Sequence, residues 1–290
     1  MRVALVDTSS VVLKGVSGFL ADAGCVVVPF KDSDAAFEAI AADRAIETLL
    51  TSFEFPGTSG LQLCAKAREL AKAENRSLYI LMMSSDTGRH KLLDALENGA
   101  DGFISKPPNP QELEARLNAA KRLKSDHRYL VHLATVDQLS ETYNRQAFLE
   151  LGEKICNKAS AKEPIAVIML DIDHFKQIND TYGHSTGDRV IKCVGNLIKQ
   201  LPGIAGRLGG EEFGIVFSAD KRQVMQLAEE LRIKIMRDST VSDSGEMLSV
   251  TVSVGVALSC RTETIIAMLK RADSALYRAK FTGRNCVKLF

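Results

Sequence analysis

Two pairs of carboxylates stand where predicted strands end. Asp171 and Asp173 come directly after the apolar run IAVIML, and Glu211 and Glu212 come directly after a glycine pair. Adjacent strands would bring these side chains to one edge of a sheet, where their charges repel unless a cation neutralises them. Carboxylate oxygens are the ligands that Mg²⁺ and Mn²⁺ prefer, and two such ions about 3.5–4 Å apart suit an in-line displacement at phosphorus. The pattern therefore predicts phosphoryl-transfer chemistry.

Simpler roles for the same acids remain open. We expect Asp173 to cap the helix that is predicted to begin at His174, because an aspartate before a helix accepts from its first free N–H groups. A glycine pair followed by two acids is, taken alone, more typical of an exposed hairpin turn than of a catalytic loop. The choice between these interpretations depends on the motifs that surround the acids.

Short apolar runs alternate with amphipathic stretches in the first half of the chain. The apolar runs are Val3–Val6, Val26–Phe30, Glu47–Thr51, Leu78–Met83 and Gly102–Ile104, and the amphipathic stretches include Val11–Ala23 and Leu61–Ala73. This alternation is typical of βα units with a parallel sheet. We predict a flavodoxin-like, doubly wound domain of five parallel strands, whose functional groups lie at the carboxyl ends of the strands.

A long helix is predicted to leave this domain, running from Gln111 to about Ala134 after the Asn109-Pro110 start signal. Its apolar residues, at spacings of three, four and seven, are Leu113, Leu117, Ala120, Leu123, Leu130 and Ala134. We expect this seam to pair with a second copy of the chain, and the alternative is a solvated linker helix. The expected divisions are residues 1–120 for the first domain, 121–134 for the helical linker and 135–290 for the second domain.

The second domain is predicted to be α/β, with a mixed or antiparallel central sheet. Its expected helices are Asn144–Ser160, Phe175–Tyr182, Ser185–Gln200, Lys221–Arg237 and Glu263–Thr282. Its expected strands are Ile165–Leu170, a hairpin over Gly206–Phe217 with Gly209-Gly210 at its turn, and one long alternating strand over Leu248–Ser259.

Composition narrows the class of protein. The 290 residues suit two domains of about 100–200 residues each, and a net charge of +1 gives no overall field that favours nucleic acid or an anionic membrane. The six cysteines include no CxxC pair, which favours reduced thiols. No apolar run approaches the roughly 18 residues needed to span a bilayer. We expect a cytoplasmic protein without nucleic-acid or membrane partners.

Several longer motifs in the second half decide its interpretation. They are DQLSETYNRQAF at Asp137–Phe148, DIDHFKQINDTYGHSTGD at Asp171–Asp188, RLGGEEF at Arg207–Phe213, VSVGVA at Val252–Ala257 and RADSALYRAKFTGRN at Arg271–Asn285. Together they resemble the GGDEF family of diguanylate cyclases, over about Thr135–Phe290. The resemblance implies a nucleotidyl cyclase palm-like fold. It also implies a homodimer that condenses two GTP into cyclic di-GMP and two pyrophosphates, with two Mg²⁺ or Mn²⁺ per active site.

The same resemblance implies roles for the acidic residues. Asp171 matches a metal-binding carboxylate, and Ile172 offers its backbone carbonyl to the same ion. Glu211 matches a metal ligand and proposed general base, and Glu212 matches the second signature acid near the metals. Lys176 matches the lysine that stabilises charge in the transition state.

Substrate contacts are implied in the same way. Asn179 and Asp188 match the pair that binds the guanine edge, His184 matches a further substrate contact, and Lys280 and Arg284 match the cations that hold the triphosphate. A carboxylate at 188 can accept from guanine N1–H and its exocyclic amine, which favours GTP over ATP. Gly209 and Gly210 lack Cβ atoms, so their backbone can approach the phosphates closely.

One departure from the family concerns feedback. Many members carry an inhibitory product site, Arg-x-x-Asp, just before the signature hairpin, and the corresponding residues here are Gln200-Leu201-Pro202-Gly203. Both charged residues are missing, so we predict no product inhibition through that site.

The first half resembles a two-component receiver. The resemblance rests on VALVDTSS near the start, FPGTSG at Phe55–Gly60, SSDTG at Ser84–Gly88 and GADGFISKP at Gly99–Pro107. Ser84 matches the switch hydroxyl and Lys106 the family lysine, whose bond to the following proline is expected to be cis. The phosphoacceptor position, however, holds Ser52, and Asp7 is the only acid of the usual pair. We therefore predict a pseudo-receiver that is not phosphorylated in the usual way and that dimerises, binds a partner or senses a different signal.

Two other functions compete with an active cyclase. One is a catalytically silent GGDEF domain that binds GTP or a partner protein, which the intact GGEEF sequence disfavours. The other is a phosphorelay or DNA-binding response regulator, which the missing acceptor aspartate and the missing basic recognition helix disfavour.

Overall fold

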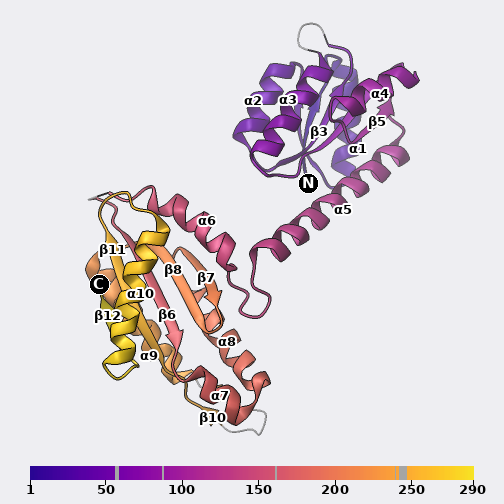
Figure 1. Ribbon diagram of the computed structural model, residues 1–290. Helices are drawn as coiled ribbons and strands as arrows, with labels where there is room; N and C mark the ends of the chain where they lie inside the picture. The colour runs from indigo at the N-terminus through magenta and orange to yellow at the C-terminus, as the bar shows by residue number, and fades with distance from the viewer. Residues whose placement is uncertain (56–58, 87, 161, 239, 242–246) are drawn as a thin grey trace. The chain divides into compact units, whose positions relative to one another are not determined.

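The computed structural model describes the chain except for residues 56–58, 87, 161, 239 and 242–246 (Figure 1). The chain forms two compact units, Met1–Leu130 and Val131–Phe290. Within the described residues, none of the helices combines the length and the apolar character that a bilayer crossing requires.

The first unit is a five-stranded parallel sheet with the strand order β2-β1-β3-β4-β5. Its strands are β1 Arg2–Val6, β2 Val26–Phe30, β3 Ile46–Ser52, β4 Tyr79–Ser84 and β5 Gly102–Ser105. Its helices are α1 Ser10–Asp22, α2 Ser33–Ala42, α3 Gly60–Ala73, α4 Arg89–Glu97 and α5 Pro110–Thr135. Separate apolar clusters cover the two faces of the sheet, which confirms the predicted doubly wound fold.

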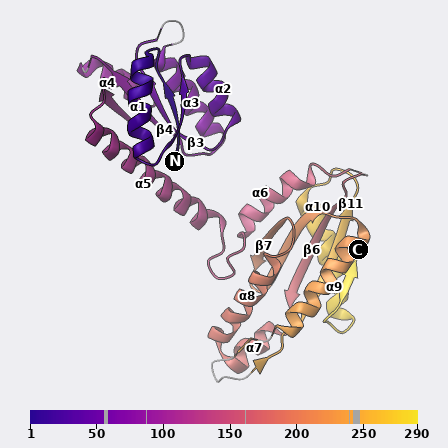
Figure 2. The same cartoon turned by 180° about the vertical axis from the view of Figure 1, so that it is seen from behind.

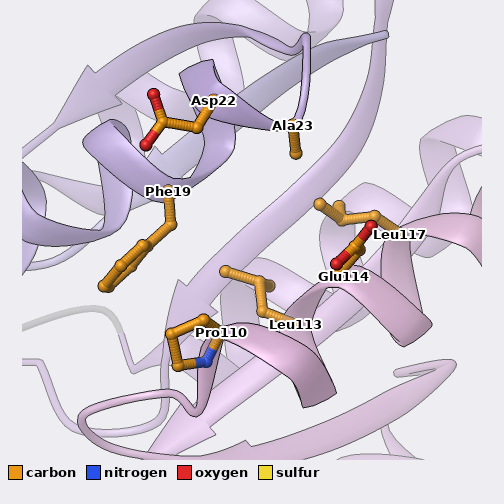
Figure 3. Close-up of a pocket in the computed structure, with 7 residues that line it drawn as sticks. All are labelled: Phe19, Asp22, Ala23, Pro110, Leu113, Glu114 and Leu117. Carbon is orange, nitrogen blue, oxygen red and sulfur yellow. The ribbon is translucent and has the colours of Figure 1, made fainter.

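Helix α5 divides the predicted apolar seam in two. Leu113 and Leu117 are buried in the core of the first unit, where they also line a hollow of about 230 Å³ between α1 and α5 (Figure 3). By contrast, Leu123 is 53% exposed and Leu130 is 62% exposed. The first half of the seam therefore packs within its own unit, and pairing with a second copy stays a prediction for the second half alone.

The second unit is built on a sheet with the strand order β12-β11-β6-β8-β7, in which only the β11–β12 pair is parallel. Its strands are β6 Ile165–Ile172, β7 Ile204–Gly209, β8 Glu212–Ser218, β11 Val252–Ser259 and β12 Val287–Leu289. Its helices are α6 Arg145–Cys156, α7 Phe175–Tyr182, α8 His184–Ile198, α9 Lys221–Arg237 and α10 Ile265–Phe281. Helices α6 and α10 cover one face (Figure 1), and α8 and α9 cover the other (Figure 2). The mixed sheet confirms the predicted class.

The predicted strand Leu248–Ser259 was wrong in its extent. Met247–Leu248 forms β10, which pairs with β9, Thr240–Val241, outside the central sheet, and only Val252–Ser259 joins that sheet. The Thr251 carbonyl accepts from the backbone N–H of Asp173 at 2.9 Å, which continues the register of the β6–β11 ladder by one residue before the chain turns away toward β10. Strand β11 is buried on both faces, so its apparent alternation did not mark an exposed side. Strands β9, β10 and β12 were not predicted.

Candidate active site

The two acidic pairs meet because β6 and β8 are antiparallel neighbours. Asp171 lies opposite Glu212 in the ladder, and Leu170 lies opposite Phe213. Asp171 is only 6% exposed, while Glu211 and Glu212 are half-buried. The strand ends that carry the three carboxylates are therefore adjacent, as the sequence predicted.

The side chain of Arg207 stabilises the tight turn between β7 and β8. Gly210 adopts a φ of +44°, and the ladder shifts register between Arg207 and Gly209. The Arg207 Nε donates to the Gly210 carbonyl at 2.8 Å, and its Nη1 lies 3.2 Å from Asp137 Oδ1. Burial raises the pKa of Asp137, but hydrogen bonds from Ser140 and Arg207 outweigh it, so the pKa of Asp137 lies below its usual value. The Asp137–Arg207 pair was not predicted as part of the site.

Lys280, in the last turn of α10, reaches Asp171 across the face of the sheet. Its Nζ lies 2.7 Å from Asp171 Oδ2. Burial raises the pKa of Asp171, Lys280 lowers it, and the charges of Glu211 and Glu212 raise it further, leaving the pKa above the usual carboxyl value. The negative charge at this edge is thus only partly compensated.

Whether these residues suit a divalent cation can be judged from their chemistry. In the part of the chain that the structure describes, no group of three His, Cys, Asp or Glu side chains converges closely enough to hold a metal ion, and Asp171 is paired with Lys280 instead. The donors are nevertheless all hard oxygens, and the unbalanced charge around Asp171 is what a cation would relieve. The residues therefore fit Mg²⁺ or Mn²⁺.

Asp173 does not cap the following helix, so that expectation was wrong. The residue before α7 is His174, in a left-handed conformation with φ +57° and without a side-chain capping bond. The Asp173 carboxylate is buried and accepts from Thr251 Oγ1 at 2.8 Å, from Ser253 Oγ at 2.6 Å and from the backbone N–H of Asn285 at 3.1 Å. Because the side chain turns toward β11, it cannot reach the N–H groups of α7.

The residues predicted to bind guanine lie where α7 meets α8. The helices are joined at Gly183, whose φ is +83°. They approach so closely that a Cβ on Gly187 would lie 1.9 Å from Asn179 Oδ1. Asp188 follows on α8 and is exposed, as is His184 in the first turn of that helix. Asn179 and Asp188 are therefore carried on contacting turns of two helices.

The second predicted triphosphate cation lies in a turn after α10. Gly283, Arg284 and Asn285 have φ values of +107°, +61° and +45°, so the chain is left-handed at three residues in a row. The Arg284 N–H donates to the Ala279 carbonyl at 3.0 Å, and its side chain is exposed. Lys280 and Arg284 thus flank the end of one helix.

In the first unit, the residues that match the receiver site are connected to one another by an ion pair and hydrogen bonds. Asp7, Ser52 and Ser84 are buried near the carboxyl ends of β1, β3 and β4. Lys106 Nζ lies 2.6 Å from Asp7 Oδ2 and also donates to Ser52 Oγ. The Lys106-Pro107 bond is cis, as predicted.

Glu54 completes this network and was missed in the sequence. Ser84 Oγ donates to Glu54 Oε1 at 2.9 Å, and Lys91 Nζ lies 2.7 Å from the same oxygen. Burial raises the pKa of Glu54, but Lys91 and Ser84 outweigh it and leave that pKa below its usual value. Parts of two predicted receiver motifs, FPGTSG and SSDTG, lie outside the described residues, namely Pro56–Thr58 and Thr87.

Comparison with known families agrees with both halves. Residues 134–286 match the model described as diguanylate cyclase, GGDEF domain, and residues 3–118 match the response regulator receiver domain. The chain belongs to the GGDEF family of diguanylate cyclases.

Individual GGDEF proteins show the extent of the likeness. Response regulator PleD of Caulobacter vibrioides is 31% identical over 301 residues, which cover 99% of this chain and 65% of PleD. The chain therefore spans 65% of the length of that relative. Diguanylate cyclase VdcA of Vibrio cholerae is 38% identical over 186 residues, 60% of this chain and 54% of VdcA. The crystal structure of the coiled coil and GGDEF domain of DgcB from Caulobacter crescentus, in complex with c-di-GMP, has a TM-score of 0.56 and 35% identity, covering 61% of this chain and 99% of that one.

The segment that replaces the GGDEF product site is shaped by other contacts. Gln200 Oε1 accepts from Lys234 Nζ at 2.7 Å. Gly203 has a φ of +89°, and a Cβ there would lie 2.2 Å from the Val216 carbonyl oxygen. An aspartate at 203 would require the backbone to move. The local structure therefore disfavours the aspartate of the Arg-x-x-Asp motif at this position.

The predicted site residues of the GGDEF unit thus fall into three groups. Asp171, Glu211, Glu212 and Lys280 are brought together at the sheet edge. Asn179, Asp188 and His184 lie on α7 and α8, and Lys176 is exposed on the first turn of α7. Arg284 is exposed in the turn after α10.

Proposed function

We propose that this chain is a diguanylate cyclase, which condenses two GTP into cyclic di-GMP with release of two pyrophosphates across a homodimer. The observation that carries the proposal is the pairing of Asp171 with Glu212 in adjacent strands, beside the turn of an intact GGEEF sequence and within reach of Lys280. A relative named diguanylate cyclase and a structural neighbour solved with c-di-GMP support the same activity.

Two Mg²⁺ or Mn²⁺ ions per active site belong to this proposal. The carboxylates of Asp171, Glu211 and Glu212 and the carbonyl of Ile172 would hold them. When bound, such ions neutralise charge on the phosphates and promote in-line displacement at phosphorus.

The chain's own residues would position the substrate. Asn179 and Asp188 would hydrogen-bond the guanine edge, with His184 as a further contact on the same helix as Asp188. Lys280 and Arg284 would bind the triphosphate. Lys280 now pairs with Asp171, so it must exchange that carboxylate for phosphate oxygens when the nucleotide arrives.

The chemical step forms a bond between the 3′-oxygen of one GTP and the α-phosphorus of the other, and breaks the bond to the departing pyrophosphate. Glu211 would accept the proton from the attacking hydroxyl, and Lys176 would offset the charge that develops on the transferring phosphoryl group. Each chain is proposed to bind one GTP. A second copy must therefore present the attacking nucleotide, and the exposed part of the α5 seam would bring the copies together.

The receiver unit is proposed to act without phosphorylation. Ser52 offers no acceptor carboxylate, and the lysine that would otherwise face a phosphoryl group is already engaged by Asp7 and Ser52. We propose that this unit dimerises or binds a protein partner. Stable transfer of ³²P from acetyl phosphate to one residue of the full chain would contradict this part.

The deciding experiment incubates the purified chain with GTP and Mg²⁺ and identifies the product by chromatography. Cyclic di-GMP and pyrophosphate are expected, with a rate that rises more steeply than linearly with protein concentration. Glu211→Ala should lose at least 100-fold in rate, on the order of what positioned proton transfer contributes, while Glu230→Ala, exposed on α9, should retain activity. If the folded wild-type chain binds GTP but forms no product with Mg²⁺ or Mn²⁺, the silent GGDEF alternative is correct.

A further inference from the structure

Asp173 ties together three segments that are distant in sequence. Its buried carboxylate, 4% exposed, accepts hydrogen bonds from Thr251 and Ser253 on the β11 side and from the backbone N–H of Asn285 after α10. Its own backbone N–H donates to the Thr251 carbonyl. It also follows directly after Ile172, the residue whose carbonyl is proposed to bind metal. One carboxylate therefore fixes the end of β6 to the turn that carries Arg284.

That turn needs external anchors. Arg284 and Asn285 are both non-glycine residues in the left-handed region, which is unfavourable for side chains with a Cβ. Asn285 has three contacts outside the turn: its N–H donates to Asp173, its Oδ1 accepts from Arg232 Nη1 at 2.6 Å, and its Nδ2 donates weakly to Met236 Sδ at 3.6 Å. Arg232 is in turn braced by Glu229, whose carboxylate oxygens lie 3.1 Å from Arg232 Nε. The conformation of the turn is thus held by residues outside it.

We propose that Asp173 is a positioning residue, which sets Arg284 and the end of α10 at the correct place relative to Asp171 so that metal and triphosphate are bound together. This inference rests on the proposed cyclase function. Asp173 itself does not touch the substrate, since its oxygens are taken up by Thr251, Ser253 and Asn285. It acts by holding the backbone beside Arg284.

The inference predicts an effect that depends on the phosphates of the ligand. A hydrogen bond to a charged group contributes about 1.5–3 kcal/mol, so losing the contact of a misplaced Arg284 with the phosphates corresponds to roughly 10- to 100-fold in affinity. Loss of the anchor should therefore weaken binding of a nucleotide triphosphate strongly. Binding of the guanine moiety should be unaffected, because Asn179 and Asp188 are carried on α7 and α8.

The test compares equilibrium binding of α,β-methylene GTP, which cannot be turned over, with binding of GMP, both in Mg²⁺. Asp173→Ala should weaken α,β-methylene GTP by about 10- to 100-fold and GMP by less than about twofold. Asp173→Asn should recover most of the loss. Its amide oxygen can still accept from Thr251 and Asn285, and the Ser253 hydroxyl can rotate so that it accepts from the amide N–H. A merely structural role would lower the melting temperature and leave the ratio of the two affinities unchanged, which would overturn the proposal.

A second pair of variants keeps the test decisive if Asp173→Ala does not fold. Arg232→Ala removes the side-chain anchor of Asn285 from a partly exposed helix face, and should weaken α,β-methylene GTP by about three- to tenfold with GMP unchanged, a fraction of the full loss. Glu230→Ala is the matched control, because Glu230 is exposed on the same helix, accepts from Gln226 rather than from Arg232, and should leave both affinities within about twofold. Equal effects on both nucleotides, or no effect of Arg232→Ala, would overturn the anchor. If the wild-type chain binds α,β-methylene GTP but makes no cyclic di-GMP, the proposed activity is refuted. The role of Asp173 is still tested in that case, because it depends on the ratio of the two affinities and not on turnover.

Discussion

Replacing Gly187 by alanine tests how guanine is bound, because this glycine leaves room for the Asn179 side chain. A Cβ at 187 would lie 1.9 Å from Asn179 Oδ1, whereas ordinary van der Waals contact begins at 3.4 Å. The amide must therefore retreat by at least 1.5 Å, the difference between these two distances. The ring of Phe175, with Cζ 3.2 Å from the same Cβ, limits the directions in which the new methyl group itself can shift.

Stability and binding should respond in opposite directions. Gly187 lies within α8, where glycine costs about 0.5–1 kcal/mol relative to alanine, and the atom that must move belongs to a rotatable side chain. Gly187→Ala should thus unfold at an equal or higher urea concentration than wild type. A displaced Asn179 leaves a guanine hydrogen bond unmade, which costs about 1–3 kcal/mol. At 1.4 kcal/mol for each factor of ten, this corresponds to about 5- to 150-fold weaker binding.

Isothermal titration calorimetry with α,β-methylene GTP measures this loss directly, and the double variant supplies the control. In an Asn179→Ala background there is no amide to displace, so adding Gly187→Ala should change the affinity by less than about twofold. If Gly187→Ala bound as tightly as wild type, or if the two substitutions were additive, Asn179 would not be the group through which this glycine acts.

Three further outcomes are expected. Because the pKa of Asp137 is lowered, its ionised form stabilises the fold above about pH 4 and this contribution is lost as pH falls through the lowered pKa. Asp137→Asn should cost about 1 kcal/mol at pH 7, and a cost that does not decline at all as pH falls below about 4 would refute a stabilising Asp137–Arg207 pair. A Cβ on Gly255 would lie 2.1 Å from a backbone oxygen of α10. Gly255→Ala should therefore destabilise the second unit by about 3 kcal/mol or more in urea unfolding. Stability near that of the wild type would contradict this and show that α10 can move away from β11. Cyclic di-GMP added to the assay should not inhibit through residues 200–203, and inhibition that Gln200→Ala abolished would contradict that expectation.

Patterns that repeat within one element could be predicted from the sequence. Four of the five parallel strands of the first unit, such as β1 and β4, are short and mostly buried runs, whereas the edge strand β2 is half-buried or exposed, and all five are visible as apolar runs in the sequence. The meeting of Asp171 with the GGEEF turn could also be predicted, because both follow strand signals and antiparallel neighbours share an edge. The order of the elements along the chain and the adjacency of β6 and β8 were therefore enough to predict the arrangement of the acids.

Contacts across long sequence separations could not be predicted in the same way. Asp173 looks like a helix cap to its own neighbours, yet its partners lie 78, 80 and 112 residues away. Arg207 and Asp137 are 70 residues apart, and no spacing rule pairs them. Glu54 could not be distinguished from any exposed loop acid until Ser84 and Lys91 were seen around it. In each case the tertiary structure supplies the partner that decides the role.

These long-range contacts share a consequence for how the site works. Asp171 is buried, has like charges nearby and is paired with Lys280, so the site holds an excess of negative charge that its proposed ligands would relieve. A divalent cation would release Lys280 from Asp171, and a triphosphate would then offer that lysine new oxygens. Under the proposed function, each ligand would therefore remove an obstacle to the other, and metal and nucleotide binding would be coupled. Such coupling requires that Lys280 and Asp171 stay within reach while they change partners, and the anchoring of the end of α10 to β6 through Asp173 provides that constraint.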